Sequence, residues 1–343
     1  MRIPFSSAAA TVSNVVEVAA IAEEEGFHAV VTGDHLNCAV DRHLYHRMGR
    51  GVLGEIGTTE EPNFFESLTT LSFLAGRFPT LEFATGVMLL PIREPILLAK
   101  QIANLDAMSR GRISIGIGVG NATDREEFGV FGLKYGFAER WALAREYLEA
   151  MMEIWTKPKS SYQGKYVRFE GATIYPKPFR KPHPPLWIGG HSDTSLRIGA
   201  QLCDGWTGTA TTLEEFSKYK ETFLHYAKEA GRGSDSFDFV SLTRVSISKD
   251  REDARRNIDG VTLGHKATSH FGYSRSQVTD DEEAVRRLNL RAAVGTPSDV
   301  LKRLEELVEA GITYFDLYFM YPELGHLLRQ AKLFAKEIIP SFS

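Results

Sequence analysis

The chain has 343 residues, of which 43% are hydrophobic and 24% charged, and it carries a formal net charge of -4. These proportions exclude a largely disordered chain, and the lack of a basic excess argues against a nucleic-acid or anionic-membrane partner. The two cysteines, Cys38 and Cys203, are far apart, and there is neither an apolar run of about 18 residues nor a signal-peptide pattern, so we expect a cytoplasmic protein without disulfides or a membrane span.

Short apolar runs alternate along the chain with longer amphipathic stretches, which predicts alternating strands and helices. Strands are predicted in chain order over residues 2–5, 29–32, 81–90, 112–118 and 186–188, at Trp206, and over residues 237–247 and 314–319. Helices are predicted from residue 12 to a stop at Gly26, around Leu71 and Leu74, and over residues 95–108, 138–155, 192–202, 213–230, 250–258, 297–310 and 323–336.

This alternation predicts parallel strands joined by helical crossovers. Eight such units favour a closed (β/α)8 TIM barrel, here one domain over residues 1–343, and the alternative is an open doubly wound sheet. Three stretches do not follow the period, namely residues 37–61, 156–185 and 262–290. The first directly follows a strand, so we expect it at the C-terminal face, where barrels build their sites. The second lies between a helix and a strand and fits a small hairpin at the other face.

Asp34 and His35 directly follow the apolar run over residues 29–33. In a barrel this position is the catalytic rim, where a histidine donates a hydrogen bond or moves a proton near neutral pH. The alternative is a histidine that caps the loop and takes no part in chemistry.

His43 and His46, with Asp41 close by, raise a metal hypothesis, because an i, i+3 pair can share one helical face. Against it, no third ligand is close in the sequence, and arginines stand at positions 42 and 47 on either side of the pair. We therefore expect no metal site, and keep a metal centre only as an alternative.

Two glycine-containing segments follow predicted strands. The first, GIGVGN at 116–121, lacks the third glycine of a dinucleotide loop, and its next predicted helix begins only near residue 138. Its glycines either let a ligand approach the strand end or allow tight packing. The second, GGHSDT at 189–194, directly precedes a helix, so its N–H groups and hydroxyls form either an anion site or an ordinary helix cap. Later loops of barrels often hold phosphate, which favours the anion site.

Two further positions call for an interpretation. Gly86 stands inside the third predicted strand, between Thr85 and Val87, where it indicates a bulge, a close backbone approach or simple packing. Arg140 opens the helix over residues 138–155, and we expect it to pair with a glutamate of that helix such as Glu146.

Taken together, these segments resemble the bacterial-luciferase-like superfamily over nearly the whole chain. The resemblance is carried by three signatures in the right order: TGVMLLPIREP at 85–95 with LDAMSRGR at 105–112 and EFGVFG at 127–132, PLWIGGHS at 185–192 with CDGW at 203–206, and GTP at 295–297 with AGI at 310–312. It implies a (β/α)8 barrel, often dimeric, that binds reduced FMN or the deazaflavin coenzyme F420 at its C-terminal face.

The resemblance also implies roles for single residues. The positions that correspond to ligands of the cofactor phosphate are Gly190, His191, Ser192 and Thr194. The positions that correspond to the surroundings of the ring are Thr85, Gly86, Val87, Val119 and Asn121, with a non-prolyl cis peptide at either Thr85–Gly86 or Gly86–Val87. His35 corresponds to a catalytic histidine beside cofactor and substrate. There are two departures: luciferases themselves carry arginine in place of Val119, and deazaflavin-dependent sugar-phosphate dehydrogenases carry glutamate in place of Asn121.

The resemblance therefore predicts an oxidoreductase that acts on a small organic substrate. Either reduced FMN and O2 oxygenate this substrate, with a separate flavin reductase as a partner, or F420 transfers a hydride to or from it. We expect a homodimer in which His35 steers a proton and residues 37–61 and 262–290 form the substrate pocket. Two other functions stay open: a metal-dependent barrel hydrolase that uses Asp34, His35, His43 and His46, and a flavin-binding protein without turnover.

Overall fold

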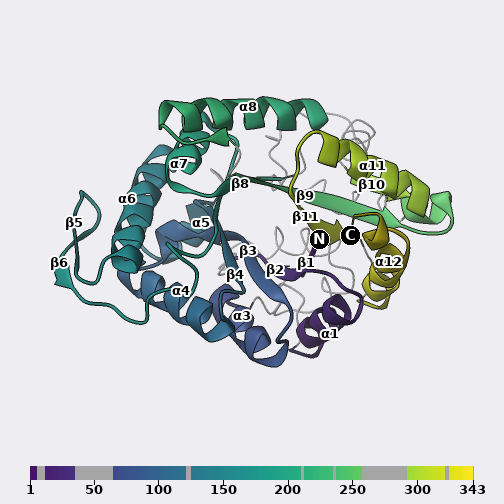
Figure 1. Cartoon of the computed structure of the whole chain (residues 1–343), viewed down its shortest axis with the longest axis horizontal. Coiled ribbons are helices and arrows are strands. Elements are labelled where there is room, and N and C mark those ends of the chain that lie inside the picture. Colours follow the sequence, from purple (N-terminus) through teal and green to yellow (C-terminus); the bar gives the residue numbers. More distant parts are fainter. Residues whose placement is uncertain are drawn as a thin grey trace.

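The apolar runs form a closed barrel of parallel strands inside a ring of helices (Figure 1). The structure, a computed structural model, describes residues 1–5, 12–34, 65–120, 125–209, 212–234, 237–256, 292–320 and 324–342. Around the barrel the strands are β1 (Arg2–Phe5), β2 (Ala29–Thr32), β3 (Glu82–Leu89), β4 (Ile113–Gly118), β7 (Leu186–Gly189), β8 (Gly205–Thr209), β9 (Asp238–Ile247) and β11 (Tyr314–Phe319). Pairing of β8 with β9 closes the ring, which confirms the barrel and excludes the open sheet.

The helices cover the outside of the barrel (Figure 1). They are α1 (Val12–Glu24), α3 (Ser67–Arg77), α4 (Pro95–Ser109), α5 (Arg125–Val130), α6 (Phe137–Thr156), α7 (Asp193–Leu202), α8 (Leu213–Glu229), α11 (Pro297–Glu309) and α12 (Leu324–Glu337). Capping boxes fix the starts of two of them, with Thr212 and Glu215 at α8 and Thr296 and Asp299 at α11. None of the described helices is long and apolar enough to cross a membrane.

Side chains of each strand point alternately outward and inward. Outward residues such as Phe83, Ile115 and Phe239 belong to the main hydrophobic cluster, together with the buried faces of the helices. A separate small cluster, Val31, Ala84, Trp187 and Val240, comes from alternating positions of four barrel strands. It fills the barrel interior, as side-chain layers do in other barrels. Such a filled interior leaves the ends of the strands as the place for a site.

One strand was not predicted. β10 (Ala292–Gly295) pairs with the second half of β9, from Ala292 opposite Arg244 to Gly295 opposite Ile247. The strand β8 pairs with β9 only as far as Leu242, so it leaves this edge open to β10. The sequence prediction missed β10 because four small residues without alternation give no strand signal.

The middle irregular stretch contains the predicted hairpin, formed by the antiparallel strands β5 (Ser160–Gln163) and β6 (Arg168–Ala172). The hairpin projects from the ring beside α6 (Figure 1). The segment after it passes the first residue of β3, where Arg180 pairs with Glu82. The other two stretches, residues 37–61 and 262–290, lie outside the described residues. Of the helix predicted over residues 250–258, the structure describes 251–256 as helical.

Candidate active site

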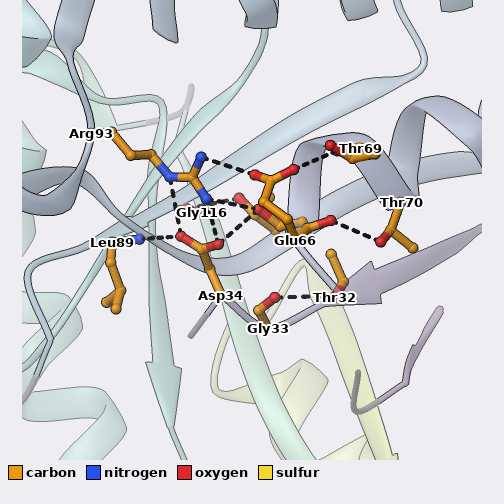
Figure 2. Close-up of polar contacts among 11 residues, drawn as sticks. Thr32, Gly33, Asp34, Glu66, Thr69, Thr70, Leu89, Arg93 and Gly116 are labelled. Atoms are coloured by element: carbon orange, nitrogen blue, oxygen red, sulfur yellow. Dashed lines mark hydrogen bonds and ion pairs between the residues drawn. The ribbon is translucent and has the colours of Figure 1, made fainter. Parts of the chain in front are cut away.

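The carboxylate of Asp34, just beyond β2, is buried and held by three other segments of the chain (Figure 2). Its Oδ2 accepts the N–H of Leu89 at 2.8 Å. Its Oδ1 accepts the Ser67 hydroxyl at 2.9 Å and the Arg93 Nη2–H at 2.6 Å. Arg93 in turn pairs with Glu66, with 2.9 Å between Nη1 and Oε1. Asp34 therefore anchors the C-terminal end of β2 to the neighbouring strand and to α3.

The charges of Asp34, Arg93 and Glu66 stabilise one another. Burial alone would lower the pKa of Arg93, but the nearby carboxylates of Asp34 and Glu66 raise it above its ordinary value. Burial alone would raise the pKa of Glu66, but hydrogen bonds from Thr69 and the charge of Arg93 bring it below its ordinary value. Arg93 and Glu66 therefore stay charged at neutral pH, and Asp34 faces a permanent positive charge.

This arrangement weakens the metal hypothesis. Asp34 already accepts hydrogen bonds on both oxygens, so it is not free to bind a metal ion. In the part of the chain that the structure describes, no group of three or more histidine, cysteine, aspartate or glutamate side chains is placed to hold a metal. The other residues of the hypothesis, His35, Asp41, His43 and His46, lie outside the described residues.

The side chain of Val87 rests in a cradle of glycines. The Gly86–Val87 peptide bond is cis, which answers the choice between the two bonds of this segment. A Cβ atom on Gly118 would lie 2.5 Å from Val87 Cγ2, and one on Gly116 or Gly189 would lie 3.2 Å from Val87 Cγ1. Gly116 and Gly118 therefore serve close packing against the neighbouring strand β3, Gly116 mainly against the Thr85 carbonyl and Gly118 against the Val87 side chain. Gly86 and Val87 themselves stay partly exposed.

Changing Gly118 to alanine is expected to lower the free energy of unfolding by about 1–3 kcal/mol, because the new methyl group overlaps Val87. Val87→Ala removes the overlapping atom, so the double variant should be more stable than the sum of the single changes implies. Gly76→Ala in α3 is the control, since no atom lies within 4 Å of its new Cβ. Urea unfolding measures all four variants, and strictly additive losses would contradict the contact.

The start of α7 combines a helix cap with free donors. Gly190, which links β7 to α7, has a φ of 98°, a conformation that favours glycine. Ser192 is the N-cap, and its Oγ accepts the Ser195 N–H at 3.1 Å. The N–H groups of Asp193 and Thr194 have no partner among the described residues, as expected for the first turn of a helix. The capping prediction is thus correct for Ser192, and two N–H groups remain to bind an anion.

Aromatic rings fix this turn from the side of β8 and α8. The ring of His191 packs against those of Trp206 and Tyr219, with centroids 5.8 Å and 4.9 Å away, and these two rings also contact each other. Trp206 also donates its indole N–H to the Gly190 carbonyl at 2.8 Å. The backbone at Gly190 and His191 is therefore held in place before any ligand binds.

Trp141 packs its indole ring against the same turn. It lies near the start of α6, is 3% exposed, and its Nε1 is buried with no hydrogen-bond partner among the described residues. Its Cζ2, bonded to the ring carbon that carries Nε1, lies 3.2 Å from the position of a Cβ on Gly190. A buried donor without an acceptor costs about 1–3 kcal/mol, so such a group indicates a missing partner. The donors of Asp193, Thr194 and Trp141, which we call the anion seat, fit the phosphate of FMN or F420.

The remaining residues of the sequence prediction are placed as follows. Thr85 is buried and donates its hydroxyl to the Gly116 carbonyl at 2.9 Å. Val119 is 1% exposed and packs in the main hydrophobic cluster, so its backbone is the part able to meet a ligand. Asn121 and His35 lie outside the described residues.

The pairing expected for Arg140 is not what the structure shows. Its guanidinium lies 3.6 Å from the centroid of the Phe128 ring and donates to the Val119 carbonyl at 3.4 Å. The expected partner, Glu146, instead accepts the N–H groups of Tyr166 and Val167 at 2.7 and 3.2 Å. The β5–β6 turn is distant in sequence, so helical spacing alone did not reveal this competitor.

Two buried charges in the barrel were not singled out from the sequence. Arg244 on β9 and Asp316 on β11 are 3% and 4% exposed. Arg244 stands four residues after Val240 on β9, so both side chains lie on the interior face of the strand. A Cβ on Gly86 would lie 3.9 Å from Asp316 Oδ2. Asp316 therefore lies beside the Gly86–Val87 segment inside the barrel, and Arg244 lies on the interior face of β9. A single charged residue in a strand gives no sign of the face on which it lies until the register is known.

Comparison with known proteins identifies the family. The model of the family described as luciferase-like monooxygenase matches residues 3–314. The chain belongs to this family. An uncharacterised protein of Mycobacterium tuberculosis is 34% identical over 198 residues, which are 57% of this chain and 67% of that protein. An F420-dependent glucose-6-phosphate dehydrogenase of Nakamurella multipartita is 27% identical over 341 residues, which are 96% of this chain and 92% of that protein.

The fold of this luciferase-like chain also matches solved structures. The structure of long-chain alkane monooxygenase has a TM-score of 0.80 at 18% identity, and the match covers 99% of this chain and 90% of that one. The family inferred from three sequence signatures and the barrel predicted from the alternation of strands and helices are thus confirmed. The sequence analysis did not identify Trp141 as a residue of the site, because only the packing of α6 against α7 brings its ring to Gly190.

Proposed function

We propose that this luciferase-like protein is an oxidoreductase that binds reduced FMN or coenzyme F420 at the C-terminal mouth of its barrel. It would oxidise or reduce a small organic substrate there. The observation that carries the proposal is the anion seat, where the N–H groups of Asp193 and Thr194 and the buried Nε1 of Trp141 have no partner among the described residues and the Trp141 ring packs against Gly190. When bound, the reduced cofactor supplies hydride transfer or reaction with O2. The chain itself binds the cofactor, orients it and excludes water.

The roles of the residues follow from their places in the fold. Gly190, His191, Ser192 and Thr194 form the turn and first helical residues around the anion seat, and they would bind the phosphate. The partly exposed segment Gly86–Val87, with Thr85 beneath it, would support one face of the ring. Val119, through its backbone, and Asn121 would face the ring from the end of β4. His35 would hold or move a proton between the substrate and solvent.

The sequence comparison favours F420 over FMN. The Nakamurella relative, which matches over more than nine tenths of both chains, is named as F420-dependent. The FMN alternative keeps its support from the family, whose description is luciferase-like monooxygenase. We therefore infer a deazaflavin-dependent hydride transfer as the main function and an FMN- and O2-dependent oxygenation as the second.

Anaerobic titration with F420 and, separately, with reduced FMN tests this proposal, with protein fluorescence as the signal. Selective micromolar binding of F420 would support hydride transfer, and selective binding of reduced FMN would support oxygenation. Binding of neither by folded protein would contradict the proposal. Stoichiometric metal in the purified protein would favour the hydrolase, and tight binding without hydride or O2 reactivity would favour a flavin-binding protein without turnover.

Trp141→Phe is expected to weaken cofactor binding while it leaves the thermal stability of the free protein nearly unchanged. The change keeps an aromatic ring and removes a buried donor that has no partner among the described residues, but the smaller ring also leaves a cavity. Because these two effects oppose each other, the free protein should unfold close to the native temperature. A lost hydrogen bond to a charged phosphate should at the same time weaken cofactor binding about tenfold. Thermal unfolding without cofactor and titration with cofactor measure the two effects. Unchanged affinity would remove Trp141 from the anion seat.

The remaining expectations concern the context of the enzyme. We infer that the chain acts as one domain over residues 1–343 and as a homodimer in the cytoplasm. With FMN as cofactor, a separate flavin reductase would supply the reduced form. Sedimentation of the purified protein tests the dimer, and turnover with and without an added reductase tests the partner.

A further inference from the structure

A carboxylate stands directly beside the anion seat. Asp193 is the first residue of α7, and its own N–H and that of Thr194 are the backbone donors of the seat. An acidic side chain in the first turn of a helix is attracted to the same N–H groups that bind an external anion. It also repels a phosphate a few ångströms away. Left free, the Asp193 carboxylate would therefore compete with the cofactor phosphate.

In the structure this carboxylate is hydrogen-bonded to a side chain of α8. Tyr226 is 8% exposed, and its hydroxyl donates a hydrogen bond to Asp193 Oδ1. The Tyr226 ring is covered by the guanidinium of Arg197, whose carbon lies 4.1 Å from the ring centroid. Arg197 is itself 3.7 Å from Glu229 Oε2. The hydrogen bond to Asp193 raises the pKa of Tyr226, so its hydroxyl remains a donor at neutral pH.

We propose that Tyr226 is a positioning residue for the cofactor phosphate, because it holds the Asp193 carboxylate against α8 and keeps the anion seat open. The inference rests on the proposed function, since it concerns the same phosphate. It adds a residue that never touches the cofactor. Its role is to keep the Asp193 carboxylate away from the N–H groups at the start of α7, which would otherwise attract it.

Two matched pairs of probes test this role by binding alone. Reduced FMN and reduced riboflavin differ only in the phosphate, and F420 and its phosphate-free deazariboflavin chromophore share the ring but not the phosphodiester. Tyr226→Phe is expected to raise the dissociation constant of the phosphate-bearing member about three- to tenfold. The affinity for the phosphate-free member should stay unchanged. Raising the salt concentration should reduce the difference, because it screens the exposed Asp193 charge.

Removal of the competing charge provides the rescue. Asp193→Asn in the Tyr226→Phe background should restore the affinity of the native protein, and Asp193→Asn alone should bind at least as tightly as the native protein. Tyr162→Phe is the matched control, because Tyr162 donates to the Glu149 carboxylate at 2.6 Å on the far side of α6. An equal loss for both members of a pair, or a failed rescue, would overturn the inference.

Inorganic phosphate separates this inference from the proposed function, because it needs no ring site. If native protein binds neither F420 nor reduced FMN, the proposed function fails, and phosphate titration of the same variants still reports on Tyr226. A phosphate dissociation constant that Tyr226→Phe leaves unchanged overturns the inference on its own.

Discussion

Arg93→Ala is expected to lower the free energy of unfolding by about 3–5 kcal/mol. The Asp34 side chain is 1% exposed and that of Arg93 is 13% exposed, with 2.6 Å between Nη2 and Oδ1. Without the guanidinium, the buried carboxylate keeps the Ser67 hydroxyl and the Leu89 N–H as its partners among the described residues. Urea unfolding followed by circular dichroism measures the loss.

A second ion pair of the same type serves as the control. Arg180 and Glu82 are 3.0 Å apart, but their side chains are 34% and 25% exposed. Arg180→Ala should therefore cost about 1 kcal/mol or less. Asp34→Asn in the Arg93→Ala background removes the buried charge and should recover part of the loss. Similar small losses for Arg93→Ala and Arg180→Ala would show that Asp34 does not depend on Arg93.

His35→Ala is expected to reduce turnover about 100- to 10,000-fold and to leave cofactor affinity unchanged. The expectation rests on the neighbouring residue, because Asp34 is fixed at the end of β2 by the network around Arg93. In the sheet, Thr32 of β2 pairs with Thr85 of β3, directly before the Gly86–Val87 segment proposed to support the ring. The chain therefore leaves β2 beside this segment, which is why we expect the residue after Asp34 to exchange a proton with a bound substrate.

His28→Ala is the control for this change. His28 precedes the other end of β2 and pairs with Glu82, with 3.3 Å between Nε2 and Oε2. Its loss should leave turnover unchanged, because it stands at the N-terminal face of the barrel. Steady-state rates of both variants, measured with saturating cofactor, test this expectation. Turnover of His35→Ala within a few fold of the native rate would remove His35 from the mechanism.

Much of the fold was predictable because the signal was periodic. The strand predicted over residues 81–90 is β3 (Glu82–Leu89), and the helix predicted over 95–108 is α4 (Pro95–Ser109). Both have long, regular apolar patterns with a proline or glycine close to their ends. β10 (Ala292–Gly295) has neither the length nor the alternation, and its pairing depends on where β8 ends. Local sequence cannot supply that information.

The candidate site was predictable where one segment forms it, and not where several segments meet. The capping role of Ser192 follows from its place before an amphipathic helix. The need for glycine at position 118 does not follow from the local sequence, because the atom that excludes a side chain there belongs to Val87 on another strand. The same holds for Trp141 and Tyr226, which reach the start of α7 from α6 and α8.

A crystal structure with F420, or with FMN if that cofactor binds, tests the central claim most directly. Our account predicts the phosphate at the start of α7, with its oxygens within about 3.2 Å of the N–H groups of Asp193 and Thr194 and of Trp141 Nε1. The ring should lie against Val87. A phosphate bound elsewhere, with Trp141 Nε1 still without an acceptor, would contradict the anion seat and the function proposed from it.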